Sequence, residues 1–525
     1  MIMTTTNDSR QKQGNTPILR AGTGKVDITV NEGELSYGLY PERVMEHIPP
    51  QFREQRVKID DPLFVRALVL DDGTEKTVLV TMDCCAIAAR TTSQFILYDS
   101  PDDFMPRLRK RVETELGIPG DRVSVSASHV HAPGRMLCDD DEQVNRTVAA
   151  IKQALDNLTP VTIGVGAGHE DTLTYNRTWI MKDGTDSSWR PEPPGPEIER
   201  MRPIDPEIGI VRMDRLDGSP LAVLYDFASH ILPAVRGGNI TSDFPGVTSA
   251  YLEERLGGGF TAIFLQGANG DIIEAHYDDR ENRRDKYDFG YRLGRSVMQA
   301  YRGIKTGPAT VRVATRHVVF PLRKDIPEAV AKVRHEQAEL VASLRYVRLS
   351  FKTFLPLYLK YALHPDFPND VPHRYLAAEL RGDDRPRKLD EQNRGAIETY
   401  LQGQRAMERM AANELKIATL TKHGEIIAEL GGKSVPAEIK GIRMGDAVFV
   451  AAPMEVLSEV GFKVKKLSPF KHTYIISNSN GYLHYSPPAS AYGRGGYEST
   501  ECLLAPEWEE IFMEAVREML KDELR

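Results

Sequence analysis

The chain has 525 residues, of which 41% are hydrophobic, and its 67 basic and 75 acidic residues give a formal net charge of −8. A chain of this length can bury a large core and has room for a deep pocket. Since the charges are interspersed, with no basic stripe and no acidic tail, the composition argues against a nucleic-acid partner and favours a small-molecule substrate.

Neither a membrane span nor a secretory signal is expected. No run of apolar residues approaches the roughly eighteen that cross a bilayer. Residues 1–17 are polar and lack an apolar signal segment, so we expect a disordered leader and a cytoplasmic protein. The spacing of the cysteines fits neither a disulfide framework nor a thiolate zinc site, so a metal would be held by histidine, carboxylate or other oxygen ligands. These cysteines are Cys84, Cys85, Cys138 and Cys502.

From residue 18 to about residue 322, short apolar strands alternate with amphipathic helices. Strands are predicted at 64–70, 77–83, 122–128, 160–165, 209–213, 221–225 and 261–265, and helices at 102–116, 143–158 and 245–256. Asp71-Asp72-Gly73 is a hairpin signal between the first two strands. The predicted fold class is mixed α/β, with multi-stranded mixed sheets and flanking helices in a single large domain that spans residues 18–525.

The pattern changes between about residues 327 and 421. Long, charged, amphipathic helices are predicted at 329–344 and 397–420, around an aromatic and basic stretch at 346–375. We interpret this part as a helical insertion, packed over or beside the mouth of a site or, with equal weight, as a solvated helical hairpin with only a packing role. The proline-rich stretch 189–206 is an ordered surface excursion or a linker. Strands return at 438–444, 447–451 and 472–477.

Histidines follow two of the predicted strands. His129 and His131 form a His-x-His motif at the end of strand 122–128. Because alternate residues of a strand share a face, both imidazoles would project together where the strand becomes a loop, as metal ligands do. The motif alone is more often a solvated strand end. His230 also follows an apolar strand and small residues, and taken alone it fits a hydrogen-bonded structural histidine.

Later segments place further polar side chains at strand ends and in glycine-rich loops. In Gly267-Ala268-Asn269-Gly270-Asp271, two glycines would let backbone amides approach a ligand, and Asp271 could orient a ligand histidine. A tight turn without a ligand is the commoner meaning of such a segment, and the ending of a phosphate loop is missing. Glu455 lies at the end of another apolar strand. Tyr482 and Tyr497 lie in glycine-rich loops, where tyrosines often only pack.

In their order along the chain, these segments resemble the catalytic domain of neutral, non-lysosomal ceramidases and their ceramidase-like bacterial relatives. The resemblance covers nearly the whole chain apart from the helical segment. It is carried by residues 21–29, 128–131, 176–177, 227–230, 270–271, 453–455, 481–482 and 495–498. The Ser-His-x-His and Gly-Gly-Tyr-Glu segments among them are the more specific.

In that family, two histidines, a glutamate and a tyrosine hold a catalytic zinc. The resemblance implies that Zn2+ is held here, with coordination left open for a water, by His129, His230, Glu455 and Tyr482. It also implies a lining made of a histidine for proton transfer, a cation for developing negative charge and a hydroxyl donor. These three residues are His131, Arg177 and Tyr497.

Two departures separate this chain from the ceramidases of that family. Ile273 stands where they carry a serine implicated in catalysis, and the chain ends at Arg525 without their C-terminal immunoglobulin-like domain or a signal peptide. We therefore expect a substrate other than ceramide. Polar residues near the altered positions could bind such a substrate, although exposed loop side chains without a role fit them slightly better. The substrate-binding candidates are Asn269, Asp271, Glu274, His276, His484 and Arg494.

Together these features predict a zinc-dependent hydrolase in which an activated water attacks an amide or ester bond of a small polar substrate. A metal-dependent carbohydrate-active hydrolase or lyase is the first alternative, because the serine is lost and polar residues are added. A zinc-stabilised binding protein without turnover is the second, and it would hold its metal in a closed coordination shell. Iron and manganese also suit these ligand types, and the sequence leaves a homo-oligomer open.

Overall fold

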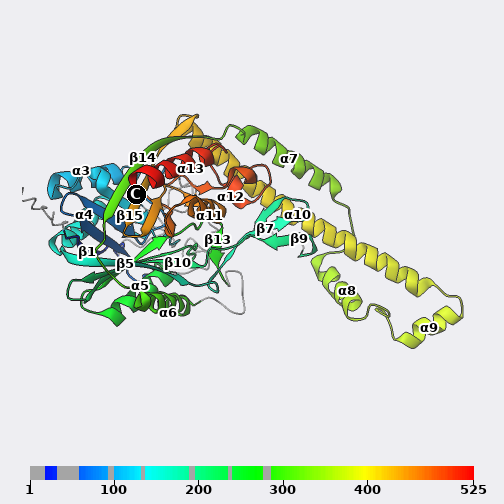
Figure 1. The fold of residues 1–525 in the computed structure, drawn as a ribbon. Coiled ribbons are helices and arrows are strands. Elements are labelled where there is room, and N and C mark those ends of the chain that lie inside the picture. Colours follow the sequence, from blue (N-terminus) through cyan, green and yellow to red (C-terminus); the bar gives the residue numbers. More distant parts are fainter. Residues whose placement is uncertain are drawn as a thin grey trace, which may run out of the picture. The chain divides into compact units, whose positions relative to one another are not determined.

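The computed structural model describes residues 18–31, 58–92, 100–131, 136–188, 195–233, 239–275 and 285–525 (Figure 1). The chain divides into two compact units. Unit 1 comprises Met1–Asp186, Ile198–Arg323 and Ile426–Arg525, and unit 2 comprises Ser187–Glu197 and Lys324–Glu425. The leader expected at residues 1–17 lies outside the described residues, as do residues 189–194 of the proline-rich stretch.

The larger sheet of unit 1 has eight strands in the order β12-β11-β10-β5-β1-β2-β3-β4. These strands are β1 (Arg20–Asp27), β2 (Phe64–Asp71), β3 (Lys76–Met82), β4 (Val123–Ala127), β5 (Thr159–His169), β10 (Glu207–Arg215), β11 (Pro220–Phe227) and β12 (Thr261–Gln266). The pairs β3–β4 and β11–β12 are parallel, and the other neighbours are antiparallel. A parallel pair needs a crossover connection, and helices α3 (Phe104–Leu116) and α5 (Asp243–Leu256) lie in these two connections.

Both faces of this sheet are buried. Along β2, Val65, Ala67 and Val69 belong to the core beneath the helices, whereas Leu68 and Leu70 belong to the core on the opposite face. This alternation follows from the two-residue repeat of a strand and explains the continuous apolar runs in the sequence. The helices on the first face are α3, α4 (Asp140–Asp156), α5 and α6 (Lys286–Gly303).

The glycines of the Ala21-Gly22-Thr23-Gly24 segment let a helix lie directly against the sheet. A Cβ atom on Gly22 would come within 2.0 Å of the carbonyl oxygen of Ala154, and one on Gly24 within 2.1 Å of that of Ala150. Both carbonyls belong to α4, so only glycine allows this close contact between α4 and β1.

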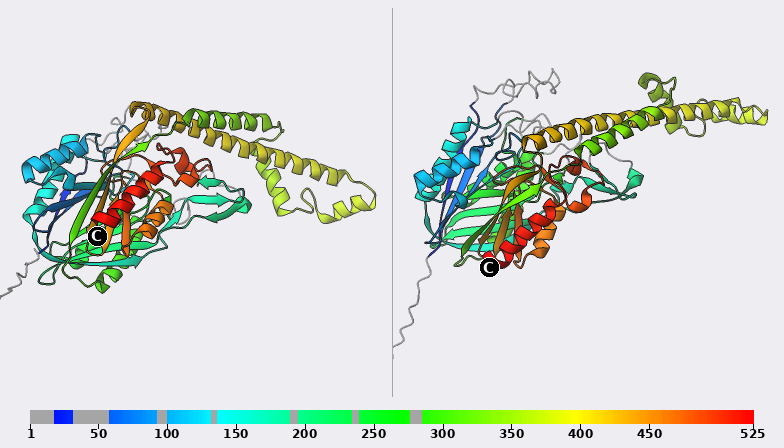
Figure 2. Two further views of the ribbon diagram at one scale, coloured as in Figure 1. Left: turned by 45° about the horizontal axis from the view of Figure 1, so that its top comes forward. Right: turned by 90° about the horizontal axis from the view of Figure 1, so that it is seen from above.

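A second sheet, in the order β14-β15-β16-β18, packs against the other face of the first (Figure 2). Its strands are β14 (Val311–Pro321), β15 (Ser434–Met444), β16 (Ala447–Ala451) and β18 (His472–Ile476). Helices α11 (Ser458–Leu467) and α13 (Trp508–Glu518) contact this second sheet, and a π-helical turn at Met519–Glu523 extends α13. Unit 1 is therefore layered as helices, sheet, sheet and helices.

Further short elements lie in unit 1, apart from the end of β8 and one 3-10 turn, which belong to unit 2. They are β6 (Thr174–Asn176), β7 (Thr178–Met181), β8 (Asp186–Ser188), β9 (Ile198–Met201), β13 (Ile272–Glu274), β17 (Glu455–Val456), β19 (Tyr485–Ser486) and α12 (Tyr497–Thr500), with 3-10 turns at Gly120–Arg122, Gly195–Glu197 and Ala489–Ala491. The parallel pair β17–β19 places Tyr485 opposite Glu455.

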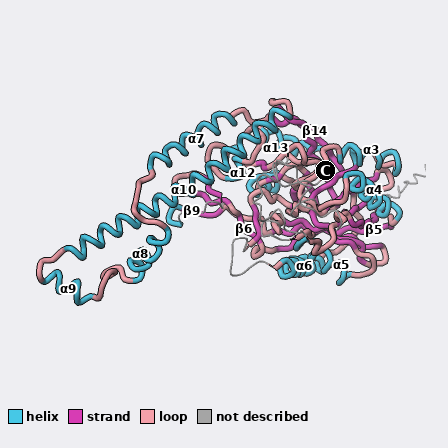
Figure 3. Tube along the Cα trace, turned by 180° about the vertical axis from the view of Figure 1, so that it is seen from behind, coloured by secondary structure: helices cyan, strands magenta, loops and turns pink. Residues whose placement is uncertain are grey.

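Unit 2 is mainly helical (Figure 3). It contains α7 (Ile326–Ser343), α8 (Phe351–Leu363), α9 (Pro372–Leu380) and most of α10 (Arg385–Glu429). The expected helix at 329–344 corresponds to α7, and the aromatic and basic stretch forms α8 and α9. None of the helices in the described part of the chain is long and apolar enough to cross a membrane.

The mixed α/β fold class, with several mixed sheets and flanking helices, is confirmed. Some predicted boundaries are wrong for physical reasons. The helix predicted at 143–158 starts at Asp140, because the Asp139 side chain accepts a hydrogen bond from the Glu142 amide and caps the first turn. The helix predicted at 397–420 is part of the much longer α10, which has Pro386 in its first turn.

Candidate metal centre

Loops that follow strands of both sheets meet at one buried place. His129 follows β4, His230 follows β11, and Glu455 lies at the start of β17, shortly after β16. Backbone hydrogen bonds fix all three residues. The His129 amide donates to the carbonyl oxygen of Cys84 at 2.9 Å, and the His230 amide donates to that of Ile272 at 2.9 Å. The Glu455 amide donates to the carbonyl oxygen of His484 at 3.0 Å.

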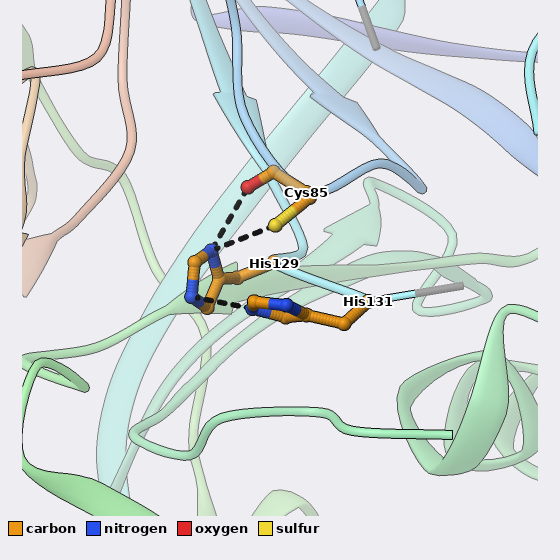
Figure 4. Close-up of side chains that lie close together, drawn as sticks. All are labelled: Cys85, His129 and His131. Carbon is orange, nitrogen blue, oxygen red and sulfur yellow. Dashed lines mark hydrogen bonds between the residues drawn. The ribbon is translucent and has the colours of Figure 1, made fainter. Parts of the chain in front are cut away.

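The two histidines of the His-x-His motif lie together, but not through the pleat of a strand. Strand β4 ends at Ala127, and His129 has a φ of +65°, a left-handed conformation that costs a histidine free energy. The rings of His129 and His131 nevertheless meet edge to face, with their Nε2 atoms 3.1 Å apart (Figure 4). The prediction that the two rings lie together is therefore correct, but they meet through the left-handed turn at His129 and not through the pleat of a strand.

Backbone carbonyls fix the tautomers of two histidines. Nδ1 of His129 lies 2.9 Å from the carbonyl oxygen of Cys85 (Figure 4). Nδ1 of His230 lies 2.9 Å from the carbonyl oxygens of both Asn269 and Ile272. A carbonyl oxygen only accepts hydrogen bonds, so each Nδ1 carries the hydrogen and each Nε2 of the neutral ring carries a lone pair.

These lone pairs face a carboxylate. Oε2 of Glu455 lies 3.3 Å from Nε2 of His129 and 3.0 Å from Nε2 of His230. All three side chains are at most 1% exposed, and Oε2 has no hydrogen-bond donor among the described residues. Burial, and then the charge of Arg177, lower the pKa of His230 to about 4, which keeps that ring neutral near pH 7.

The electron pairs of Oε2 and of the two Nε2 atoms converge in the interior and repel one another, and a cation between them would remove this cost. Zinc bonds of 2.0–2.1 Å in a tetrahedron place neighbouring ligand atoms about 3.3 Å apart. The spacings of 3.0 and 3.3 Å around Oε2 fit that edge length. The residues present therefore suit a divalent metal, and His129, His230 and Glu455 form a cluster that could hold one.

Two tyrosine hydroxyls border this cluster. Tyr482, expected as a ligand, donates to Oε1 of Glu455 at 2.6 Å, which is the oxygen turned away from the histidines. The hydroxyl of Tyr485 lies 3.2 Å from Nε2 of His230, the same nitrogen that Oε2 of Glu455 approaches. The sequence analysis did not single out Tyr485, although it lies only three residues beyond Tyr482.

Arg177 lies beside these tyrosines and is 2% exposed. Its Nε donates to Oε1 of Glu498 at 2.8 Å, and its Nη2 donates to the carbonyl oxygen of Gly270 at 2.8 Å. Its guanidinium carbon lies 5.4 Å from the ring centre of Tyr485 and 5.1 Å from that of Tyr497. The expected lining residues Arg177 and Tyr497 are thus brought together with Tyr485, in a cation–π arrangement.

Asn269 and Asp271 support the loop that holds His230. The Asn269 carbonyl accepts from His230, whereas its fully buried side-chain amide has no partner among the described residues. The Asp271 carboxylate accepts from Asn176 at 2.7 Å and from the amide and hydroxyl of Ser458 at 2.8 Å each. Asp271 therefore ties three segments together behind the cluster.

Glu274, predicted to bind the substrate or else to be an exposed loop residue without a role, is fully buried. Its Oε1 accepts a hydrogen bond from the Leu232 amide at 2.8 Å. Ile273, where the resemblance in sequence leads one to expect a serine, is also fully buried and pairs with Tyr175 across β6 and β13. His276 lies outside the described residues.

The two remaining substrate-binding candidates have protein partners. Nε2 of His484 contacts the carbonyl oxygen of Thr92, and His484 is buried with a φ of +60°. Arg494 forms an ion pair with Asp186 at 2.9 Å.

No protein-family model and no curated protein matches the chain. In structure it is similar to the neutral ceramidase of Pseudomonas aeruginosa, with a TM-score of 0.58 and 15% sequence identity over 96% of this chain and 75% of that one. A ceramidase complexed with C2 gives the same values. The chain therefore has a ceramidase-like fold.

Proposed function

We propose that this protein is a zinc-dependent hydrolase that cleaves an amide or ester bond of a small polar substrate. The convergence of two unprotonated imidazole nitrogens and one carboxylate oxygen carries this proposal. The ligands would be His129, His230 and Glu455. The ceramidase-like fold supports hydrolysis as the reaction class.

A tyrosine oxygen would complete the protein ligands, and one coordination position would stay open for a water. We assign the tyrosine oxygen to Tyr485 rather than Tyr482, because the Tyr485 hydroxyl and Oε2 of Glu455 approach the same nitrogen of His230. Tyr482 would instead hold the carboxylate of Glu455 in position through its bond to Oε1. When bound, the metal supplies a Lewis acid that lowers the pKa of a water toward neutrality.

His131 is the residue best suited to move a proton. It is half-buried, and its Nε2 lies 3.1 Å from Nε2 of His129. Burial, and then the neighbouring His129 and His230, hold its pKa well below the usual range, so the ring is neutral near pH 7, which is the form that a general base requires. Arg177, anchored by Glu498, supplies a fixed positive charge for an oxyanion, and the half-exposed Tyr497 supplies a hydroxyl.

The nucleophile would be a water rather than a side chain. Ile273 offers no hydroxyl at the position where the resemblance expects a serine, and it is sealed inside the β6–β13 pair. A water-based attack would require only a Lewis acid and a base, and a metal held by the proposed ligands would be the acid, with His131 as the base. This is why we propose an amide or ester other than ceramide.

Metal analysis of the purified protein with matched variants tests the ligand set. His129→Ala and His230→Ala should each abolish zinc retention, whereas the control Ile273→Val should retain zinc. A panel of N-acyl compounds, esters and glycosides then tests the bond. Chelation should remove hydrolysis and zinc should restore it. Full activity in a chelated sample free of zinc contradicts metal dependence, cleavage of glycosides alone contradicts the bond, and bound zinc without any cleavage supports a binding protein instead.

A further inference from the structure

Within unit 2, residues 340–365 carry no acidic side chain. Their basic residues are Arg345, Arg348, Lys352 and Lys360. The chain as a whole is acidic, with a net charge of −8, so this segment differs sharply from the rest. It includes α8, whose first turn is fixed where the Ser350 amide donates to the Thr353 hydroxyl at 2.9 Å.

Only a narrow stripe of α8 packs against its own unit. Phe354, Leu357 and Tyr361 lie three to four residues apart, on one side of the helix, and join a cluster with Ile397 of α10. The rings of Phe354 and Tyr400 stack with their centres 4.4 Å apart. This contact anchors α8 without using the rest of its surface.

Apolar side chains beside this stripe are exposed to solvent. Most of them recur every four positions and form one continuous row, whereas Tyr358 lies at the border with the stripe, where its ring stacks on that of Phe354 with the centres 5.5 Å apart. The exposed side chains are Phe351 (68% exposed), Leu355 (41%), Tyr358 (42%), Leu359 (46%) and Leu363 (70%). Single exposed apolar residues are common, but a contiguous row of this size marks an interaction surface.

The basic residues beside this row are not neutralised. Lys360 donates to the side-chain oxygen of Asn369 at 3.1 Å, and Arg345 donates to the carbonyls of Ala342 and Leu344. In the described part of the chain, none of the segment's four basic side chains forms an ion pair with a carboxylate. The surface therefore combines an apolar row with uncompensated positive charge.

We propose that α8 and the basic segment before it bind the surface of an anionic lipid bilayer, with the apolar row buried at the level of the headgroups. A helix with an apolar face flanked by lysine and arginine is the chemistry of an interfacial helix, and the basic side chains add attraction to anionic lipids. A second copy of this chain fits less well, because a symmetric contact would place the same positive charges against each other.

This site lies outside the proposed metal centre, so its test needs no hydrolysis. The full-length protein is mixed with vesicles of phosphatidylcholine alone, or of phosphatidylcholine with phosphatidylglycerol, and the bound fraction is measured by flotation. We expect binding to the anionic vesicles only, weakened by salt. Each basic residue near such a surface contributes about fivefold to affinity. The triple variant Arg345→Gln, Arg348→Gln and Lys352→Gln should therefore bind about a hundredfold more weakly.

The apolar row is tested by the triple variant Phe351→Ser, Leu355→Ser and Leu363→Ser, which should also lose binding. The matched control is Leu415→Ser on α10, whose side chain is 68% exposed but lies outside the segment. Equal binding of the wild type to neutral and anionic vesicles overturns the proposal, as does no binding to either. A concentration-dependent dimer that the apolar triple variant abolishes also overturns it, and assigns the surface to a second copy.

Discussion

Tyr482 donates a hydrogen bond of 2.6 Å to Oε1 of Glu455, and this bond sets the direction of the whole carboxylate. Because Oε1 is held in this way, Oε2 is turned toward Nε2 of both His129 and His230. Burial, and then the charge of Glu455, raise the pKa of Tyr482 well above its usual range, so its phenol keeps the proton that it donates. Tyr482 thus acts on the cluster through the orientation of Glu455.

The two tyrosines should therefore respond differently to removal of the hydroxyl. In Tyr482→Phe the proposed zinc should still bind, but its affinity should fall about 10- to 100-fold, because a partner that orients the proposed ligand Glu455 is lost. In Tyr485→Phe the loss should be larger, because a proposed ligand is itself removed. Competition with a chromophoric chelator measures both affinities. If Tyr482→Phe loses more affinity than Tyr485→Phe, the assignment of the two tyrosines is reversed.

His129, His230 and Glu455 could be proposed as ligands from the sequence because their segments resemble those of a known family, and each of them closely follows an apolar strand that is recognisable locally. Tyr485 could not be found in this way. It reaches the cluster through the β17–β19 pair, which places it opposite Glu455, and the register of such a pair is not encoded nearby in the sequence. In an unbroken strand Tyr482 and Tyr485, which lie three residues apart, would face opposite sides, and the φ of +60° at His484 interrupts this alternation.

The parts of the fold that could be predicted are likewise those with a local signal in the sequence. The β2–β3 hairpin followed from the turn at Asp72-Gly73, and strands buried on both faces were recognised by their continuous apolar runs. The order of strands in the sheets and the packing of one sheet on the other could not be derived. They depend on contacts such as that of Arg109 with Glu438, which lie 329 residues apart.

Glu438 joins helix α3 to strand β15 through a buried network of charges. Its carboxylate accepts from Arg109 at 2.7 and 2.8 Å, from Asn480 at 3.1 Å, and lies 3.3 Å from Nζ of Lys440. Glu438→Gln should lower the free energy of unfolding by about 3 kcal/mol, because Arg109 and Lys440 lose their compensating charge. The loss is large because Lys440 is only 1% exposed, so water cannot replace that charge. Urea denaturation followed by circular dichroism measures this loss.

The control for Glu438 is Glu518→Gln, which removes an exposed ion pair with Arg316. An exposed pair contributes at most about 1 kcal/mol, so this variant should stay close to wild type. Equal losses in the two variants would mean that the buried network contributes no more than a surface pair.

Asp226 should make the stability of the protein depend on pH. It lies in β11, is 5% exposed, and its Oδ2 has no hydrogen-bond donor among the described residues. Burial raises its pKa well above the usual range. The charge of Lys465 opposes this shift, and the charges of Asp205 and Glu207 add to it. In the folded state the carboxyl therefore holds its proton more tightly than in the unfolded chain.

The direction in which stability changes with pH follows from this difference in pKa between the folded and unfolded states. The protonated carboxyl favours the fold fully below the unfolded pKa of about 4, and this contribution is lost as the pH rises toward the folded pKa. Asp226→Asn cannot ionise, so it should match wild type at low pH and become progressively more stable than wild type as the pH increases. Melting temperatures of both proteins between pH 5 and pH 8 measure the difference.

Asp217→Asn is a control for Asp226 with the opposite sign. The hydroxyl and amide of Ser219 donate to the Asp217 carboxylate at 2.6 and 2.9 Å and lower its pKa, so its ionised form favours the fold. Its replacement should slightly destabilise the protein at neutral pH.

Release of a bound metal in acid would affect both variants and wild type alike, so it cancels in these differences. A gap between Asp226→Asn and wild type that stays constant with pH would contradict a buried, titrating Asp226.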